Sequence, residues 1–277
     1  MKYHCQSGKE VRLRRYIEKI GTSAINKRND IRSFFSFTGR CFKGIFSGSF
    51  MNRAVFDILV IQIYFTAYEL LSLFLILSVV YGSIFIGIVL QTVKSVGLVQ
   101  YLGDIIMGIV VLEMAPLITV FLMALRSSSA VNAEIAVMKA NHELDALVAF
   151  KIDPVEYLFV PRIISFMLSV TILSAIFSIV VLFSGFVFTK IIFQMSAGMY
   201  TDLIARSVSI PDLAVMFFKS LAFGFLISVI PIYHGWNTKY QVTAIPVAVL
   251  RGMMSVFMSI ILIEVISLVL RLTLNYL

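Results

Sequence analysis

Five long apolar stretches restrict what this sequence can fold into more than any other feature. The clearest runs from Leu70 to Val93, 24 residues without a charge, and about 20 apolar residues are enough for a helix to cross a bilayer. Only 14% of the 277 residues are charged, against roughly 25% in an ordinary soluble domain. The sequence therefore predicts an all-α integral membrane protein and excludes a typical soluble enzyme. The five predicted transmembrane spans are about 70–93, 105–125, 160–189, 212–234 and 245–271.

Basic residues are concentrated at the start of the chain. Twelve of the 23 Lys and Arg residues lie within residues 1–53. A basic segment before apolar spans is typical of a cytoplasmic end that faces anionic lipid, whereas a nucleic-acid-binding arm is the alternative on composition alone. We favour the membrane interpretation and expect no nucleic-acid partner. Residues 1–50 are then a cytoplasmic segment and residues 51–277 one membrane domain, with the C-terminus on the opposite side of five spans.

Residues 51–69 lead into the first span and carry Arg53, Asp57 and Glu69 around an apolar body. A carboxylate deep in a bilayer is expensive. We therefore interpret this segment as an amphipathic interfacial helix that lies along the membrane surface. The alternative is that the first span simply begins early.

The longest predicted cytoplasmic loop joins spans two and three. Residues 131–149 in it contain neither Gly nor Pro and predict one short helix. Asp153 and Pro154 then form a typical helix start. A cytoplasmic helix tied in this way to two spans is suited to transmit the motion of a partner protein to the bundle.

One arc of the predicted 131–149 helix is mainly charged, and Ile135 and Met138 project from it as neighbours. These two side chains either enter a groove of a partner or pack on the return strand of the loop, and the sequence leaves both possibilities open. The residues that we expect at a docking surface are Glu134, Ile135, Met138, Lys139, His142, Glu143 and Asp145.

Six short motifs, in order and at characteristic spacing, resemble the MlaE/YrbE permease family, the membrane subunits of ABC transporters that work with MCE-domain proteins in lipid trafficking. The motifs are Leu112–Pro116, Arg126–Ala130, Ala133–Met138, Glu143–Leu147, Ile152–Pro154 and Val160–Arg162. The resemblance is continuous over about residues 80–165 and weaker beyond. One departure is Leu112, where the family usually has an Arg beside the glutamate that corresponds to Glu113.

The resemblance implies a non-catalytic permease with an interfacial helix, five spans and a coupling helix at 131–149 that sits in a groove of a separate ATPase. By the same resemblance we expect a permease homodimer, two ATPase subunits that bind ATP and Mg, and an outer MCE ring, expected to be hexameric. The expected substrate is a lipid, with phospholipid favoured. The expected location is the bacterial inner membrane, with the N-terminus cytoplasmic and the C-terminus periplasmic. The chloroplast envelope is the alternative location.

Glu113, Lys219 and Glu264 are charged residues inside predicted spans. A charge at mid-bilayer costs at least ~2.5–3.5 kcal/mol on insertion scales, so such groups face the bundle interior or a wet cavity. Either the three satisfy one another and fix packing, or they form a polar lining for a lipid headgroup path. Lipid tails would need an apolar cavity, whose candidates in the first and fifth spans are Leu77, Tyr81, Ile84, Ile88, Met254, Phe257 and Ile261.

Other chemistry has little support in the sequence. The three histidines are far apart, no spacing of His, Cys and carboxylates fits a metal site, and we expect this chain to bind no cofactor. No phosphate-binding P-loop motif is present, so ATP is expected in a partner chain. No G-x-S-x-G motif supports a membrane serine hydrolase. The remaining alternative is an ATP-independent secondary transporter or channel that uses Glu113, Lys219 and Glu264.

Overall fold

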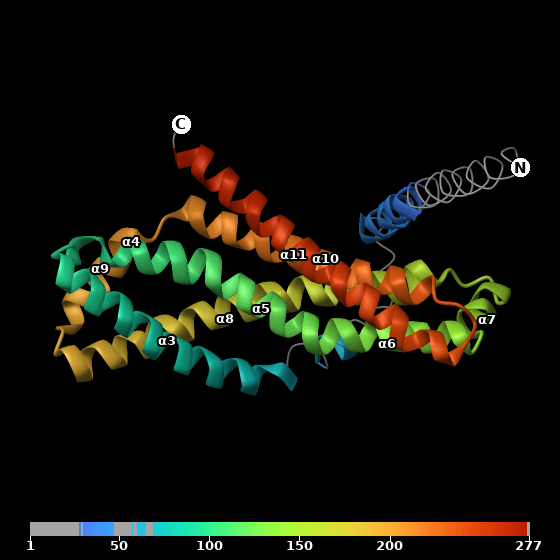
Figure 1. Ribbon diagram of the computed structural model, residues 1–277, viewed down its shortest axis with the longest axis horizontal. Helices are drawn as coiled ribbons and strands as arrows, with labels where there is room; N and C mark the ends of the chain where they lie inside the picture. Colours follow the sequence, from blue (N-terminus) through green and yellow to red (C-terminus); the bar gives the residue numbers. More distant parts are fainter. Residues whose placement is uncertain (1–27, 29, 47–56, 58–59, 65–68, 276–277) are drawn as a thin grey trace, which may run out of the picture.

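The computed structural model describes residues 28, 30–46, 57, 60–64 and 69–275 (Figure 1). Within these residues the chain is helical, without a β-strand, and five helices are long and apolar enough to cross a membrane. The predicted all-α fold with five spans is thus confirmed. The five helices cover Leu70–Val96, Val99–Ala140, Val155–Phe193, Ile210–Trp236 and Val242–Arg271.

The helices form an elongated bundle whose two ends differ (Figure 1). The α7 end holds α7 (Glu143–Ala149), the last turns of α6 (Ser129–Ala140) and the 237–244 loop. The opposite α9 end holds α4 (Leu102–Ile105) and α9 (Ala197–Ser207). The loop at the α7 end joins α10 (Ile210–Trp236) to α11 (Ile245–Asn275), and α11 runs from there toward the α9 end.

The second span is one continuous helical segment from Val99 to Ala140, 42 residues in length. At about 1.5 Å per residue it is about 63 Å long, roughly twice the ~30 Å hydrocarbon core of a bilayer. It includes two π-helical stretches, Ile106–Met114 and Ala124–Ser128, on either side of α5 (Ala115–Met123). The helix is therefore longer than one bilayer crossing requires, and its last part, α6 (Ser129–Ala140), lies at the α7 end.

The prediction of a single separate helix at 131–149 is wrong. Its first half is α6, the direct continuation of the second span, and a break at Asn141 and His142 separates α6 from α7. His142 adopts a left-handed backbone with φ of 62°, which is uncommon for residues other than glycine. Side-chain contacts of His142 that the sequence does not reveal hold this conformation, as described below. The predicted start of the next helix is confirmed, because the Asp153 carboxylate accepts the Val155 N–H at 2.9 Å.

Helix α8 (Val160–Phe193) is packed on one side by α3 (Glu69–Val96) and on another by α10. Glycines permit both close approaches. A Cβ atom on Gly82 of α3 would lie 2.6 Å from the Val181 carbonyl oxygen, and one on Gly224 of α10 would lie 2.5 Å from the Met167 Cα. Small residues at such crossings allow helices in a membrane to pack backbone to backbone.

Helix α11 is much less covered than the other spans. Only 17% of the most apolar 18-residue stretch of this helix is buried, against 39–50% for the corresponding stretches of the other four spans. Exposed apolar side chains lie on it at helical spacing, namely Met254, Met258, Ile261 and Val265. This face must therefore be covered by lipid or by another protein surface.

Residues 30–46 form a helix that lies against α8 and α10 toward the α7 end. Phe37 and Cys41 are buried in this contact, and burial raises the pKa of the Cys41 thiol to about 12. Most of the predicted interfacial helix at 51–69 lies outside the described residues, as does much of the predicted 1–50 segment. The 30–46 helix itself carries exposed Phe35 and Phe46 beside basic residues, a composition typical of helices at a membrane surface.

Candidate functional site

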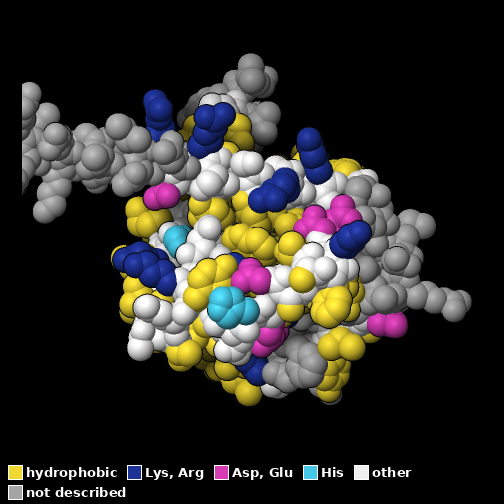
Figure 2. Space-filling model, turned by 90° about the vertical axis from the view of Figure 1, so that its right-hand side faces the viewer, with side chains coloured by type: hydrophobic (Ala, Val, Ile, Leu, Met, Phe, Trp, Pro, Cys, Tyr) yellow, Lys and Arg dark blue, Asp and Glu magenta, His cyan; other side chains and the backbone are white. Residues whose placement is uncertain are grey.

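The α7 end presents a mixed surface in which Lys and Arg side chains lie mostly toward the periphery, with carboxylates, imidazoles and apolar groups further in (Figure 2). At its centre, Lys139 at the end of α6 pairs with Asp145 of α7 at 2.9 Å and contacts the Tyr240 hydroxyl at 2.6 Å. The His142 ring stacks on the Tyr240 ring with centroids 4.5 Å apart. His142 Nδ1 also lies 3.1 Å from the second Asp145 oxygen.

These contacts join three separate segments: α6, α7 and the 237–244 loop. Hydrogen bonds from Lys139 and then His142 lower the pKa of Asp145 from its usual value. We call Lys139, His142, Asp145 and Tyr240 the Tyr240 clamp. The sequence identified the first three of these residues as exposed docking residues, but it gave no spacing signal for Tyr240, which lies about a hundred residues away.

A second contact fixes α6 to the start of α8. Arg162 donates from Nη1 and Nη2 to the two Glu134 oxygens at 2.9 and 2.5 Å. The Arg162 side chain is 4% exposed and that of Glu134 is 51% exposed. This paired, two-bond geometry is among the strong protein contacts. Glu134 therefore connects α6 to α8, although its side chain is partly exposed.

The prediction that Ile135 projects outward is wrong, since this residue is fully buried. Its side chain packs over Gly235 of α10, where an added Cβ atom would lie 3.0 Å from the Ile135 side chain. Met138 is half-buried against the core. Because α6 continues the second span, packing against the other helices sets its orientation. This packing buries the face of α6 that carries Ile135. Glu143 stays exposed, and the exposed apolar side chains at the tip are Val137, Val148 and Phe150, the last 77% exposed.

The three predicted intramembrane charges meet in one cluster near the middle of the bundle. Lys219 of α10 hydrogen-bonds to Glu113 of the second span and lies 2.9 Å from Glu264 of α11. Arg271 of α11 joins them, 3.3 Å from Glu113 and 3.0 Å from the Gly108 carbonyl. Two cations and two carboxylates thus balance, which is the arrangement that buried charges require.

Arg271 is the last residue of the predicted fifth span, but it was not among the intramembrane charges expected from the sequence. Arg271 is seven positions after Glu264, about two helical turns, so both lie on one face of α11. That spacing could have identified it. The resembling family usually has an arginine beside the glutamate, where this chain has Leu112. In this chain Arg271 places a positive charge beside Glu113 instead.

The π-helical stretch Ile106–Met114 brings Glu113 to this cluster. Such distortions of a helix are frequent at functional sites. Pro116 has no N–H to give to the Leu112 carbonyl four residues earlier, and this carbonyl lies 3.4 Å from Lys219 Nζ. The same lysine therefore pairs with a carboxylate and contacts a carbonyl that the proline leaves without its usual donor.

The seven residues predicted to line one apolar cavity do not lie together in the structure. The candidates on α3, Leu77, Tyr81, Ile84 and Ile88, lie on a helix that packs on α8, whereas Met254, Phe257 and Ile261 lie on α11, which packs on α10 and α6. Tyr81 stacks on Phe85, Phe257 stacks on Phe121, and the other five are exposed. Among the described residues, no three His, Cys, Asp or Glu side chains gather as metal ligands would.

Five membrane-length helices around a buried, charge-balanced cluster define a multi-pass α-helical membrane protein. The family model described as Permease MlaE matches residues 59–270, so the chain belongs to the MlaE permease family, as its motifs indicated. It is 27% identical over 229 residues to a probable ABC transporter permease protein of Synechocystis sp., which covers 81% of this chain and 86% of the relative.

Two further relatives carry more specific names. The intermembrane phospholipid transport system permease protein MlaE of Haemophilus influenzae is 27% identical over 224 residues, 78% of this chain and 83% of that protein. The chloroplastic protein TRIGALACTOSYLDIACYLGLYCEROL 1 of Arabidopsis thaliana is 29% identical over 142 residues, 51% of this chain and 41% of that protein. Two of these three relatives are thus named as permeases of transport systems.

Proposed function

We propose that this chain is the permease subunit of an ABC transporter that moves phospholipid between the membrane and an MCE-domain partner. A separate ATPase subunit, which binds ATP and Mg, drives the movement, and the permease itself performs no catalysis. The names of its relatives support the transporter class and, in one case, phospholipid as the substrate. The observation that carries the mechanism is the α7 end, where exposed apolar side chains lie on α6 and α7, and where hydrogen bonds join α6 to α8 and to the 237–244 loop.

The α7 end has the properties of a docking surface for the ATPase. Val148 and Phe150 are 56% and 77% exposed, and Glu143 lies exposed at the start of α7. Apolar groups ringed by charge are typical of protein interaction sites. Of the residues expected there, Lys139, His142 and Asp145 act as the Tyr240 clamp, Glu134 binds Arg162, and Ile135 and Met138 pack beneath. A push on α7 is thereby passed to the second span, α8 and the loop before α11.

The exposed face of α11 supports a second permease copy as partner. Met254, Met258, Ile261 and Val265 follow one another at spacings of three and four residues and are all more than half exposed. Such a stripe suits helix-on-helix packing. The MCE ring, expected to be hexameric, would then lie at the α9 end of the dimer.

The positive-inside rule supports a cytoplasmic α7 end. The elements at this end and the adjoining 30–46 helix carry basic residues, namely Arg32, Arg40, Lys43, Lys151, Lys239 and Arg251. The C-terminus is then periplasmic. A bacterial inner membrane is the expected location, and the chloroplast relative keeps the plastid envelope as the alternative.

Co-purification with the ATPase tests the proposal. We expect the double variant Val148→Asp, Phe150→Asp to fold, to lose the ATPase and to lose ATP-driven transfer of phospholipid to the MCE partner. The matched control is Met199→Asp, Val208→Asp, which alters two half-exposed apolar residues at the α9 end and should retain both. Retention of the ATPase by the folded α7 variant would overturn the docking assignment. Transfer driven by an ion gradient without ATP would instead support a secondary transporter that uses Glu113, Lys219 and Glu264.

A further inference from the structure

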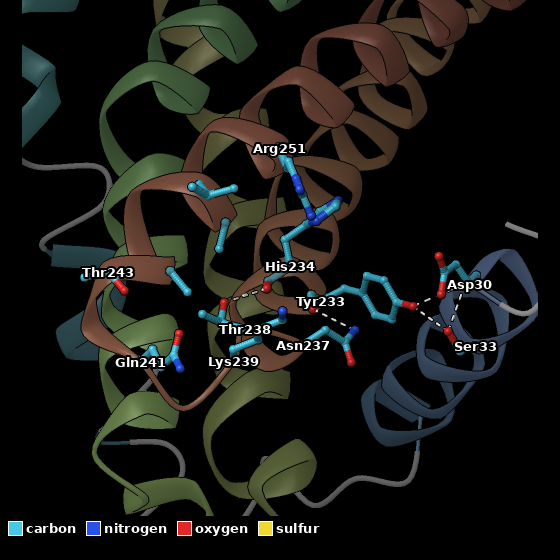
Figure 3. Close-up of a pocket in the computed structure, with 13 residues that line it drawn as sticks. Asp30, Ser33, Tyr233, His234, Asn237, Thr238, Lys239, Gln241, Thr243 and Arg251 are labelled. Atoms are coloured by element: carbon cyan, nitrogen blue, oxygen red, sulfur yellow. Dashed lines mark hydrogen bonds between the residues drawn. The ribbon is translucent and has the colours of Figure 1, made fainter. Parts of the chain in front are cut away.

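A cavity of about 860 Å³ lies at the α7 end, outside both the docking surface and the intramembrane cluster. Its walls come from the 30–46 helix, the last turns of α10, the 237–244 loop and the first turns of α11 (Figure 3). The size falls within the range of about 300–1,000 Å³ that is typical of ligand sites. Most of its lining side chains are polar or charged.

The charges of this cavity are mainly positive and unpaired. Arg251 and Lys239 both line it, and neither forms an ion pair with a carboxylate among the described residues. Arg162, Lys139, Lys219 and Arg271, by contrast, each do. Figure 3 shows Arg251 reaching from α11 toward His234 of α10. Asp30 is the one carboxylate among the described residues that line the cavity, so the cavity favours an anion.

An apolar groove of about 320 Å³ adjoins the cavity and shares Asp30, Tyr233 and His234 with it. Ile31, Phe34 and Phe35 of the 30–46 helix form one wall, and Ile230 of α10 contributes beneath.

The opposite wall of the groove contains two serines of α11, which present little free polarity. Ser255 donates to the Arg251 carbonyl at 3.0 Å and Ser259 donates to the Ser255 carbonyl at 2.8 Å. Their hydroxyl hydrogens are thus directed to the backbone of their own helix. The groove therefore offers an almost wholly apolar path beside a basic cavity.

The 30–46 helix is fixed in its place as the outer wall. The Tyr233 hydroxyl lies 2.5 Å from the Ser33 hydroxyl and donates to the Asp30 carbonyl at 3.2 Å. The Phe34 ring packs edge-on against the Tyr233 ring, with centroids 5.1 Å apart. The same residues thus hold the helix and mark the border between the basic cavity and the apolar groove.

We propose that the cavity binds the phosphate headgroup of an anionic phospholipid, while the groove holds its acyl chain. A basic pocket between spans at the cytoplasmic side suits lipid phosphate, and arginine binds phosphate through paired hydrogen bonds. Arg251 is six residues into α11, about 9 Å from its start, and so lies near the end of this helix that the proposed function assigns to the cytoplasmic side. This site deepens the proposed function and rests on it for placing the cavity in the inner leaflet.

Native mass spectrometry of the purified full chain, with no nucleotide or ATPase present, tests the site. We expect one tightly retained phosphatidylglycerol per chain and weaker retention of zwitterionic phosphatidylcholine. The double variant Arg251→Gln, Lys239→Gln should weaken phosphatidylglycerol binding by about tenfold or more. Arg206→Gln is the control, since it removes an exposed arginine from α9 at the far end of the molecule, and it should bind as the unaltered chain does.

Two further experiments distinguish a bound lipid from a bound free phosphate. Ser259→Trp fills the groove without changing charge and should reduce phosphatidylglycerol retention, whereas sn-glycerol 3-phosphate should bind far more weakly than the lipid. Equal binding of the soluble phosphate, or full retention of lipid by the Arg251→Gln, Lys239→Gln variant, would overturn the proposal. Because the assay contains no ATP, such a failure would leave the transport function itself standing, and lost ATPase docking would leave this site standing.

Discussion

Replacement of Lys219 by methionine is the most direct test of the intramembrane cluster. Lys219 is 3% exposed at its side chain and contacts both Glu113 and Glu264, whose side chains are 14% and 15% exposed. The unaltered cluster has two cations and two carboxylates and is neutral. After Lys219→Met, one cation, Arg271, remains for two carboxylates, and of these two it contacts only Glu113. Glu264 is then left in a largely buried place without its cation.

Removal of one partner from a buried ion pair typically destabilises a protein by about 3–5 kcal/mol. We expect Lys219→Met to lower the free energy of unfolding by an amount in this range. The double variant Lys219→Met, Glu264→Gln restores neutrality around the remaining Glu113–Arg271 pair, so it should be more stable than Lys219→Met alone. Lys190→Met is the matched control, because Lys190 lies exposed in the last turn of α8 and should change stability little.

The measurement is denaturant unfolding of the four proteins in the same detergent micelle, followed by circular dichroism. A loss below about 1 kcal/mol for Lys219→Met, the scale of exposed pairs, would refute the reasoning. So would a double variant less stable than the single one, since it would mean that the charge balance of the cluster is not what Lys219 provides.

Three further predictions address other parts of the fold. Gly224→Ala should destabilise the protein by about 1–3 kcal/mol or more, because its Cβ atom would meet the Met167 backbone at 2.5 Å, whereas Gly39→Ala, with nothing within 4 Å, should not; equal melting temperatures of the two variants would contradict this packing. In a Cys5→Ser background, Cys41 should resist a maleimide at pH 8 until the protein is denatured, because burial raises the pKa of its thiol to about 12; rapid labelling of the folded protein would show that the 30–46 helix does not lie on the bundle. The pKa of Asp145 is lowered by hydrogen bonds from Lys139 and His142, so its contribution to stability is present above the unfolded pKa near 3.8 and is lost as the pH falls through the lower folded value; Asp145→Asn should therefore flatten the acid limb of thermal stability against pH, and an unchanged limb would argue against the Tyr240 clamp.

The spans were predictable from sequence because each depends on a local property, a long run without charge. Pro116 and Glu113 interrupt the second run, yet the helix passes through them, since the π-helical stretch before Pro116 and the contact from Lys219 accommodate both. The sequence could not show that this helix continues to Ala140, because hydropathy falls at the membrane edge whether or not a helix ends there.

The site was predictable only in part, because tertiary contacts decide it. Contact of Glu113, Lys219 and Glu264 with one another was one of two arrangements that the sequence left open, since few partners exist for a charge inside a membrane, and Lys219 does pair with both carboxylates. Ile135 was misjudged because its face is covered by Gly235, a residue a hundred positions later. Tyr240 was missed for the same reason, as no spacing rule connects it with His142.

Tyr240 connects the proposed docking surface with the basic cavity. Its neighbours Lys239 and Gln241 line the basic cavity, while its ring is held between α6 and α7. A displacement of α7 by a bound protein would therefore act on the loop that lines this cavity through Tyr240, in addition to the contacts that α6 makes with α10 and α11. Tyr240→Ala would then uncouple binding of a partner protein at α7 from a change in the shape of the basic cavity.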